Sequence, residues 1–156
     1  MKSRLSLPNR IIHGITILIT LVVLMDFALP GTRYTEDVVS VSRKKEKYYN
    51  AGGNWHNTYH VVTATRQFSV SKDVATTAED KQIDYALSLL FKEVNGYKLA
   101  TSNKNQIYSF RVVSGLVLPL LVFLAIGISY RFKKDLSLLL FILQVLTVGN
   151  LVMLIL

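Results

Sequence analysis

The sequence contains no cysteine, and its 156 residues include only three prolines, one tryptophan and ten acidic residues. The missing thiols exclude disulfides, thiolate metal sites, cysteine nucleophiles and acylated cysteines. They leave the redox compartment open, because a chain without thiols is compatible with either side of a membrane. Charged residues make up only 18% of the chain and apolar residues 51%. The arrangement of the apolar residues is therefore the main source of information.

The chain has three long apolar runs, Ile11–Leu29, Val112–Tyr130 and Leu136–Leu156. Each has about 20 residues, which at about 1.5 Å per helical residue is enough to cross a hydrocarbon core of about 30 Å. One insert of about 80 residues, Gly31–Phe110, separates the first run from the second. The sequence therefore predicts an α-helical membrane protein with three transmembrane helices and a small α+β domain inserted between helices 1 and 2.

The predicted order begins with a basic cytoplasmic tail (1–10), a first span (11–29) and an extracytoplasmic domain (30–110). A second span (111–130), a cytoplasmic turn (131–135) and a third span (136–156) follow. The first run has a basic start but is longer than a usual signal-peptide core. The residues that follow, Asp26–Pro30, offer no pair of small residues for cleavage. This predicts an uncleaved signal anchor of a bacterial inner membrane, with a eukaryotic membrane as the alternative.

The formal net charge of +8 is concentrated beside the apolar runs. The flanking cations are Lys2, Arg4, Arg10, Arg131, Lys133 and Lys134, and positive charge is retained on the cytoplasmic side of a membrane. The insert is nearly balanced, with eleven basic and eight acidic residues. We therefore expect no nucleic-acid binding. The basic run Arg43–Lys47 favours the inverted topology, but loops longer than about 60 residues translocate largely regardless of charge.

The insert is expected to begin with a β-hairpin. Val38–Tyr49 and Trp55–Val70 flank a turn at Gly52-Gly53, which is typical of two paired strands. A two-residue turn there pairs Val41 with Ala64. One face of the hairpin then carries Val39, Val41, Val62, Ala64, Phe68 and Val70.

A helix and a second hairpin are expected to follow. Thr76–Glu79 fits a capping box, Asn95-Gly96 fits a helix stop, and apolar residues lie between them at helical spacing: Ile83, Leu87, Leu90, Phe91 and Val94. This predicts an amphipathic helix of about 18 residues. Tyr97–Thr101 and Gln106–Phe110 then flank a second turn. The predicted order of the domain is β-β-α-β-β.

His56 and His60 are the nearest approach to a metal-binding motif. Two histidines four residues apart chelate zinc from one face of a helix. The surrounding pattern is a strand, in which such neighbours are roughly 13 Å apart. We therefore expect two strand histidines, with no metal ion and no cofactor.

Aromatic and basic residues gather near the tip of the first hairpin. They suit contact with a partner protein or with lipid headgroups, and the predicted partner-binding residues are Lys44, Lys45, Tyr48, Tyr49, Trp55 and Tyr59. The alternative is that the aromatic residues pair across the strands and stabilise the hairpin.

Polar residues within the apolar runs are the other candidates. Asp26 is the only acid in a run, and it lies roughly 5 Å from the end of the span, which favours an interfacial aspartate. A role in pairing or transport is the alternative. The remaining polar residues are expected to serve helix packing: His13, Thr16 and Thr20 in the first span, and Gln144, Thr147 and Asn150 in the third. Pro119 predicts a kink in the second span, with the freed carbonyl satisfied by neighbours.

The acids of the insert do not form a pair suited to catalysis, and Gly52-Gly53 is a turn rather than a phosphate-binding loop. We therefore expect a non-catalytic accessory, assembly or scaffold subunit of a larger envelope complex. Its expected partners are membrane lipids and a protein in that complex or a second copy. The alternative is a protomer of a homo-oligomeric channel or transporter, with Asp26, Gln144 and Asn150 as its intramembrane polar residues.

Overall fold

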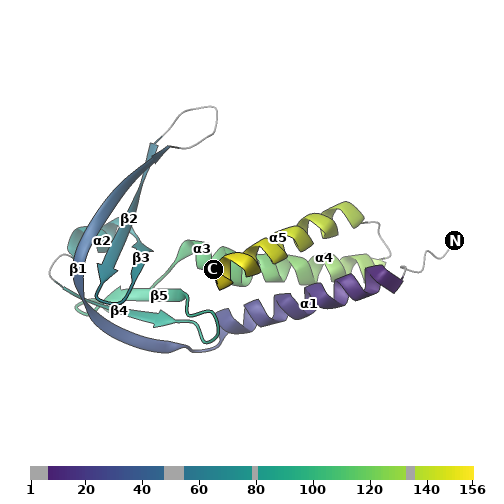
Figure 1. The fold of residues 1–156 in the computed structure, drawn as a ribbon, viewed down its shortest axis with the longest axis horizontal. Coiled ribbons are helices and arrows are strands. Elements are labelled where there is room, and N and C mark those ends of the chain that lie inside the picture. Colours follow the sequence, from purple (N-terminus) through teal and green to yellow (C-terminus); the bar gives the residue numbers. More distant parts are fainter. Residues whose placement is uncertain (1–6, 48–54, 79–80, 133–135) are drawn as a thin grey trace. The chain divides into compact units, whose positions relative to one another are not determined.

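The computed structural model describes residues 7–47, 55–78, 81–132 and 136–156. These residues form two compact units, coloured by sequence in Figure 1. The helical unit comprises the described parts of Met1–Pro30, Ser88–Glu93 and Ser109–Leu156. The sheet unit comprises those of Gly31–Leu87 and Val94–Tyr108.

The helical unit contains three long helical stretches. The first is α1 (Leu7–Ala28) and the third is α5 (Ser137–Ile155). The second is continuous and consists of α3 (Ser109–Val112), the π-helical segment η1 (Val113–Val117) and α4 (Leu118–Phe132). The stretches Arg10–Ala28, Ser109–Phe132 and Ser137–Ile155 are long and apolar enough to cross a membrane. This confirms the three predicted long apolar helices.

The three helices pack around one seam. The buried residues of α5 recur at alternating spacings of three and four: Leu140, Leu143, Thr147, Asn150 and Leu154. This spacing keeps one helix face against its neighbours, and Leu140 and Leu143 join Val122, Ala125 and Ile126 of α4 in one apolar cluster. The outer faces are also apolar, with Leu138 72% and Leu124 60% exposed. Helices that are apolar all round are typical of membrane spans.

The sheet unit is a six-stranded antiparallel sheet curved into a half-barrel, with strand order β3-β2-β1-β4-β5-β6. The strands are β1 (Thr32–Lys47), β2 (Trp55–Thr63), β3 (Gln67–Val70), β4 (Gln82–Leu87), β5 (Val94–Leu99) and β6 (Gln106–Ile107). The long strand β1 pairs with β4 through Thr32–Asp37 and with β2 from Val38 onward. A register irregularity between Val38 and Ser40 marks the change of partner.

The core of the sheet unit follows the strand alternation. In β4 the side chains of Ile83, Tyr85 and Leu87 are buried while those between them are more exposed. The short helix α2 (Lys72–Thr77) adds Val74 and Ala75 to this core. It begins after Ser71, whose hydroxyl accepts a hydrogen bond from the N–H of Val74, as N-cap serines do.

The predicted long helix between Thr76 and Val94 is wrong. The structure has two strands there, β4 and β5, joined by the loop Ser88–Glu93. Ile83 and Leu87 fit both a helical spacing and a strand alternation. Pairing of β4 with β1 satisfies its backbone groups and selects the strand.

The predicted register of the first hairpin is also wrong. Val41 pairs with Val61 rather than with Ala64. Val61 is consequently fully buried, and Val39, at the irregularity between Val38 and Ser40, is 68% exposed. The second predicted hairpin is present, since Tyr97 pairs with Gln106, but Ser109 and Phe110 already belong to α3.

Candidate functional site

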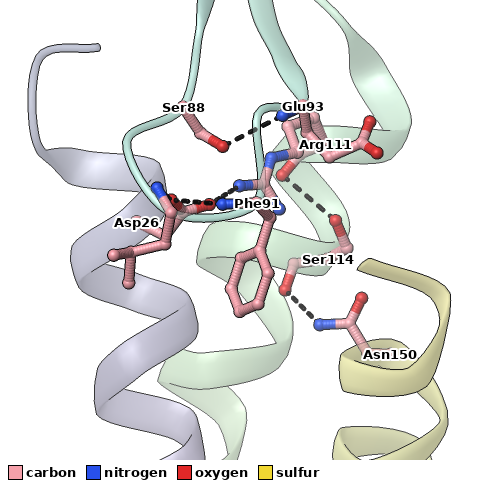
Figure 2. Close-up of polar contacts among 8 residues, drawn as sticks. Asp26, Ser88, Phe91, Glu93, Arg111, Ser114 and Asn150 are labelled. Carbon is pink, nitrogen blue, oxygen red and sulfur yellow. Dashed lines mark hydrogen bonds and ion pairs between the residues drawn. The ribbon is translucent and has the colours of Figure 1, made fainter. Parts of the chain in front are cut away.

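A buried carboxylate lies at the end of α1. The side chain of Asp26 is 0% exposed, and its Oδ2 lies 2.5 Å from a guanidinium nitrogen of Arg111 in α3. Its Oδ1 accepts hydrogen bonds from the backbone N–H of Leu90 at 2.6 Å and of Phe91 at 3.3 Å. Figure 2 shows these bonds converging on the carboxylate. The expectation that Asp26 reaches the interface without being buried is therefore wrong, and the structure shows the pairing alternative.

The loop Ser88–Glu93 is shaped to present its N–H groups to Asp26. The N–H of Ser88 donates to the carbonyl of Glu93 at 2.8 Å, and the N–H of Glu93 donates to the Ser88 hydroxyl at 3.1 Å. These bonds close the loop, and Lys92 takes the left-handed conformation with φ of 57°. Side-chain oxygens of serine commonly stabilise loops in this way. The closed loop and Arg111 together form an anion-binding site that the Asp26 carboxylate fills.

Arg111 is 2% exposed, so both charges of the ion pair are buried. Removing two charges from water is costly, and Coulomb attraction offsets that cost only when the geometry and the additional hydrogen bonds are good. Three donors reach Asp26 from two segments of the chain. Replacing one partner alone would leave the other charge buried without compensation. We call Asp26, Arg111 and the loop Ser88–Glu93 the Asp26 cluster.

A second polar contact lies one turn further along the helical stretch that begins at Ser109. The Asn150 side chain donates to the backbone carbonyl of Ser114 at 3.1 Å, as Figure 2 shows. The N–H of Leu118 bonds to the carbonyl of Val113, and Pro119 has no N–H to offer Ser114 in the π-helical pattern. Asn150 supplies the donor that the helix lacks. This agrees with the expectation that a neighbouring span satisfies the carbonyl freed by Pro119.

Close helix packing accompanies these polar contacts. A Cβ atom at Gly115 would lie 2.7 Å from Cδ2 of Phe27 and 2.8 Å from its Cβ and Cγ. These distances are shorter than real carbon contacts, so the approach of α1 to η1 requires glycine at this position.

The remaining predicted polar residues of the first span are buried in the bundle. His13, Thr16 and Thr20 are all at most 8% exposed. The two threonine hydroxyls donate to backbone carbonyls one turn earlier, and Nδ1 of His13 lies 3.4 Å from the Tyr130 hydroxyl of α4. Helix packing, the expected role, is what the structure shows for these three residues.

Gln144 occupies a different setting. It lines an open groove of about 420 Å³ between α1 and α5, whose other lining residues are Ile12, Ile15, Thr16, Ile19, Phe141, Val145, Thr147 and Val148. The structure thus separates the three predicted intramembrane polar residues. Asp26 and Asn150 make internal bonds, whereas Gln144 faces the groove.

The described members of the predicted partner-binding set, Lys44, Lys45, Trp55 and Tyr59, lie on the ribbon formed by β1 and β2. Residues opposite each other in an antiparallel pair share a face, so Arg43, Lys45 and Lys47 lie on one face with Tyr59, Asn57 and Trp55. The Nζ atoms of Lys45 and Lys47 lie 4.9 and 5.9 Å from the centre of the Trp55 ring. We call Arg43, Lys45, Lys47, Trp55 and Tyr59 the basic-aromatic face. Lys44 points to the opposite face, and Tyr48 and Tyr49 lie outside the described residues.

Glu36 of β1 is a carboxylate of the sheet unit whose pKa is shifted by its hydrogen bonds. It accepts hydrogen bonds from the hydroxyls of Thr65 at 2.7 Å and Tyr85 at 2.9 Å. Hydrogen bonds from Thr63 and Thr65, which stabilise the ionised form, lower the pKa of Glu36 to about 2. Burial and the neighbouring Glu36 raise the pKa of Tyr85.

His56 and His60 lie on β2 as expected, and Nδ1 of His60 is 3.2 Å from the Ser69 hydroxyl of β3. In the described ranges, no group of three or more histidine or acidic side chains is arranged to hold a metal ion.

The sequence interpretation missed Arg111 as the partner of Asp26. Two opposite charges at neighbouring ends of two predicted spans, the ends expected to be extracytoplasmic, are a usable signal, because an isolated charge at a membrane span is costly. The contribution of the loop backbone had no such signal, since the segment was expected to be helical.

Comparison with known proteins gives no relative for this chain: no family model, no curated protein and no solved structure matches it.

Proposed function

We propose that this chain is an integral membrane protein and acts as a non-catalytic accessory or scaffold subunit of a larger envelope complex. In this proposal the three long helices cross the membrane, the N-terminus is cytoplasmic and the sheet unit is extracytoplasmic. The charge distribution beside the helices supports this topology, because the basic residues flank the ends assigned to the cytoplasm. A bacterial inner membrane is the proposed location.

The observation that carries the proposal is the basic-aromatic face of the sheet unit. In the part of the chain that the structure describes, Lys44–Lys47 and Trp55–Thr58 pair only with each other, without a third strand. Trp55 is 56% exposed, and the side chains of Arg43, Lys45 and Lys47 are also exposed. Tryptophan and arginine are enriched where proteins contact one another. We infer that this face binds an acidic partner protein.

The helical unit supports a structural role over a transport role. Asp26, Thr16, Thr20, Thr147 and Asn150 are buried and bond to neighbouring helices, to the loop Ser88–Glu93 or to their own helix backbone. Groups that carry ions or protons through a membrane line a water-filled path. Of these residues, Asp26 and Asn150 join separate segments of the bundle, and the three threonines bond to the backbone of their own helices.

The test of partner binding is a mild-detergent pull-down through an N-terminal tag, with mass spectrometry of the eluate. A stoichiometric second protein is expected with the parent chain and is expected to be lost from the variant Lys45→Ala/Lys47→Ala/Trp55→Ala. The matched control is Lys72→Ala/Lys104→Ala, which removes two exposed lysines elsewhere in the sheet unit. Retention of the partner by the first variant would contradict the assignment of this face, and absence of a partner from the parent chain would contradict the function.

The test of topology uses the absence of native cysteine. Asn103→Cys places a thiol in an exposed loop of the sheet unit, and Arg131→Cys places one at the exposed end of α4. A membrane-impermeant maleimide applied to intact cells is expected to label the first variant and not the second. The reverse pattern would overturn the proposed orientation.

A further inference from the structure

The groove between α1 and α5 presents an amide that lacks an internal partner. Gln144 lies near the middle of α5 and is half-buried in the groove wall. Within the described segments its side chain has no hydrogen-bond partner. Its depth in the helix places it within the hydrocarbon region under the proposed membrane location, where lipid chains offer neither donor nor acceptor.

The other polar groups that line the groove are already bonded. The Thr16 hydroxyl donates to the carbonyl of Ile12 at 2.9 Å, and the Thr147 hydroxyl donates to that of Leu143 at 2.8 Å. Gln144 is therefore the group whose hydrogen bonds an occupant of the groove would complete. An acyl chain would fill the space and leave the amide unsatisfied.

We propose that the groove is the interface for a second copy of this chain, in which the two Gln144 side chains bond to each other. A primary amide carries both a donor and an acceptor, so two copies related by a two-fold axis satisfy one another. Asparagine and glutamine side chains stabilise associations of membrane helices in this way. The proposal rests on the membrane location proposed above, but not on the basic-aromatic face.

The surface around Gln144 is apolar and exposed on both sides of the groove. Phe141, Val145 and Val148 stand beside the groove on α5, with 62%, 55% and 51% of their surfaces exposed. On the α1 side the rim is formed by Ile12 and Ile15, which are 48% and 55% exposed. An isologous interface places one patch against its own copy. The exposed side chains of α5 in one copy then enter the groove of the other.

Disulfide cross-linking in membranes tests the proposal directly, because the parent chain has no cysteine. Val145→Cys and Val148→Cys place single thiols at the groove. Leu124→Cys is the matched control on α4, at a residue that is also exposed, with 60% of its surface accessible. Mild oxidation is expected to give a band of twice the chain mass with the groove thiols and not with the control. Cross-links through Leu124→Cys alone, or only to a protein of another mass, would overturn the proposal.

The role of the amide is tested by Gln144→Leu and Gln144→Asn in the Val148→Cys background. Loss of an interhelical bond of this kind corresponds to a rise of about 3- to 30-fold in the dissociation constant of the dimer. We expect this rise for leucine and near-parent association for asparagine. Equal association of all three chains would overturn the assignment of Gln144.

Two further measurements separate this proposal from the proposed function and from misfolding. Carbonate extraction reports membrane insertion, and a chain that leaves the membrane would contradict the proposed function itself. An inserted chain without groove cross-links would contradict the dimer alone. Thermal unfolding of Gln144→Leu in detergent, at a dilution where the parent chain is monomeric, is expected to match the parent chain, because Gln144 makes no internal hydrogen bond to the described residues.

Discussion

The helical unit and the sheet unit accommodate polar side chains in different ways. In the helical unit Asp26, Arg111 and Asn150 are buried and bond to groups far away in the sequence. In the sheet unit the cations of the β1–β2 ribbon are exposed, and the carboxylate of Glu36 accepts hydrogen bonds from the hydroxyls of Thr65 and Tyr85.

This difference follows from the surroundings that each sequence implies. A helix in lipid has no water to satisfy a polar side chain, so an internal partner is needed. A charged strand in water is satisfied without one, and its cations also discourage edge-to-edge association. Polar residues of the helical unit are therefore expected to determine stability, and those of the ribbon to determine binding.

The largest effect is expected from breaking the Asp26–Arg111 pair. Asp26→Leu or Arg111→Met alone leaves a buried charge without its partner, which costs about 3–5 kcal/mol. The double variant removes both charges and is expected to recover most of that loss. The part of the unfolding free energy that the double variant does not recover measures the lost hydrogen bonds from the N–H groups of Leu90 and Phe91, which contribute about 1 kcal/mol each.

The measurement is a double-mutant cycle by SDS titration in mixed micelles. If the double variant lost as much unfolding free energy as the two single variants together, the charges would not be coupled. Asp26→Asn keeps the shape of the side chain, and its free energy of unfolding is expected to lie between those of the parent chain and Asp26→Leu.

The next largest effect is expected at the helix crossing. Gly115→Ala places a Cβ against the root of the Phe27 side chain, which a change of rotamer does not relieve. Overpacking of this kind costs about 1–3 kcal/mol. Gly127→Ala is the matched control, because a Cβ there meets nothing within 4 Å, and Gly-to-Ala changes in helices stabilise by about 0.5–1 kcal/mol. Thermal unfolding in detergent should move in opposite directions for the two variants.

A smaller loss is expected from Asn150→Leu. The change leaves the Ser114 carbonyl without its donor, and interhelical bonds of this type contribute about 0.6–2 kcal/mol. Gln144→Leu in the same helix provides the comparison, since it removes an amide that is not bonded to the described residues. Similar unfolding temperatures for the two variants would contradict the importance of the Asn150 bond.

The smallest effect concerns acidity in the sheet unit. The folded pKa of Glu36, about 2, lies below the ordinary value of 4.5. Ionised Glu36 therefore contributes stability that is fully present above about pH 4.5 and is lost as the pH falls toward 2. Thermal unfolding between pH 2 and 6 should show a weaker pH dependence in Glu36→Gln than in the parent chain. If the unfolding temperature of Glu36→Gln changed with pH as steeply as that of the parent chain, the role of the Thr63 and Thr65 hydrogen bonds would be contradicted.

Parts of the fold were predictable because they depend on local patterns. The three apolar runs predicted helices close to those observed, since about 20 apolar residues in a row have few other stable arrangements. The second hairpin was also predicted, but its strands Tyr97–Thr101 and Gln106–Phe110 coincide with the observed ones only over Tyr97–Leu99 and Gln106–Ile107. The segment around Ile83 and Leu87 was misread because its spacing fits two periods, and only pairing with β1 distinguishes them.

The candidate sites show the same division. The sequence alone determined the apolar helices, the absence of thiols and the presence of Asp26, Gln144 and Asn150 within predicted spans. The tertiary structure decided that Asp26 is buried against Arg111, that Asn150 bonds to Ser114 and that Gln144 faces a groove. Hydrophobic length and periodicity are properties of neighbouring residues, so a sequence displays them directly. The partner of a polar side chain depends on which distant segments the fold brings together, and for Asp26 these include a loop that its own sequence predicted to be a helix.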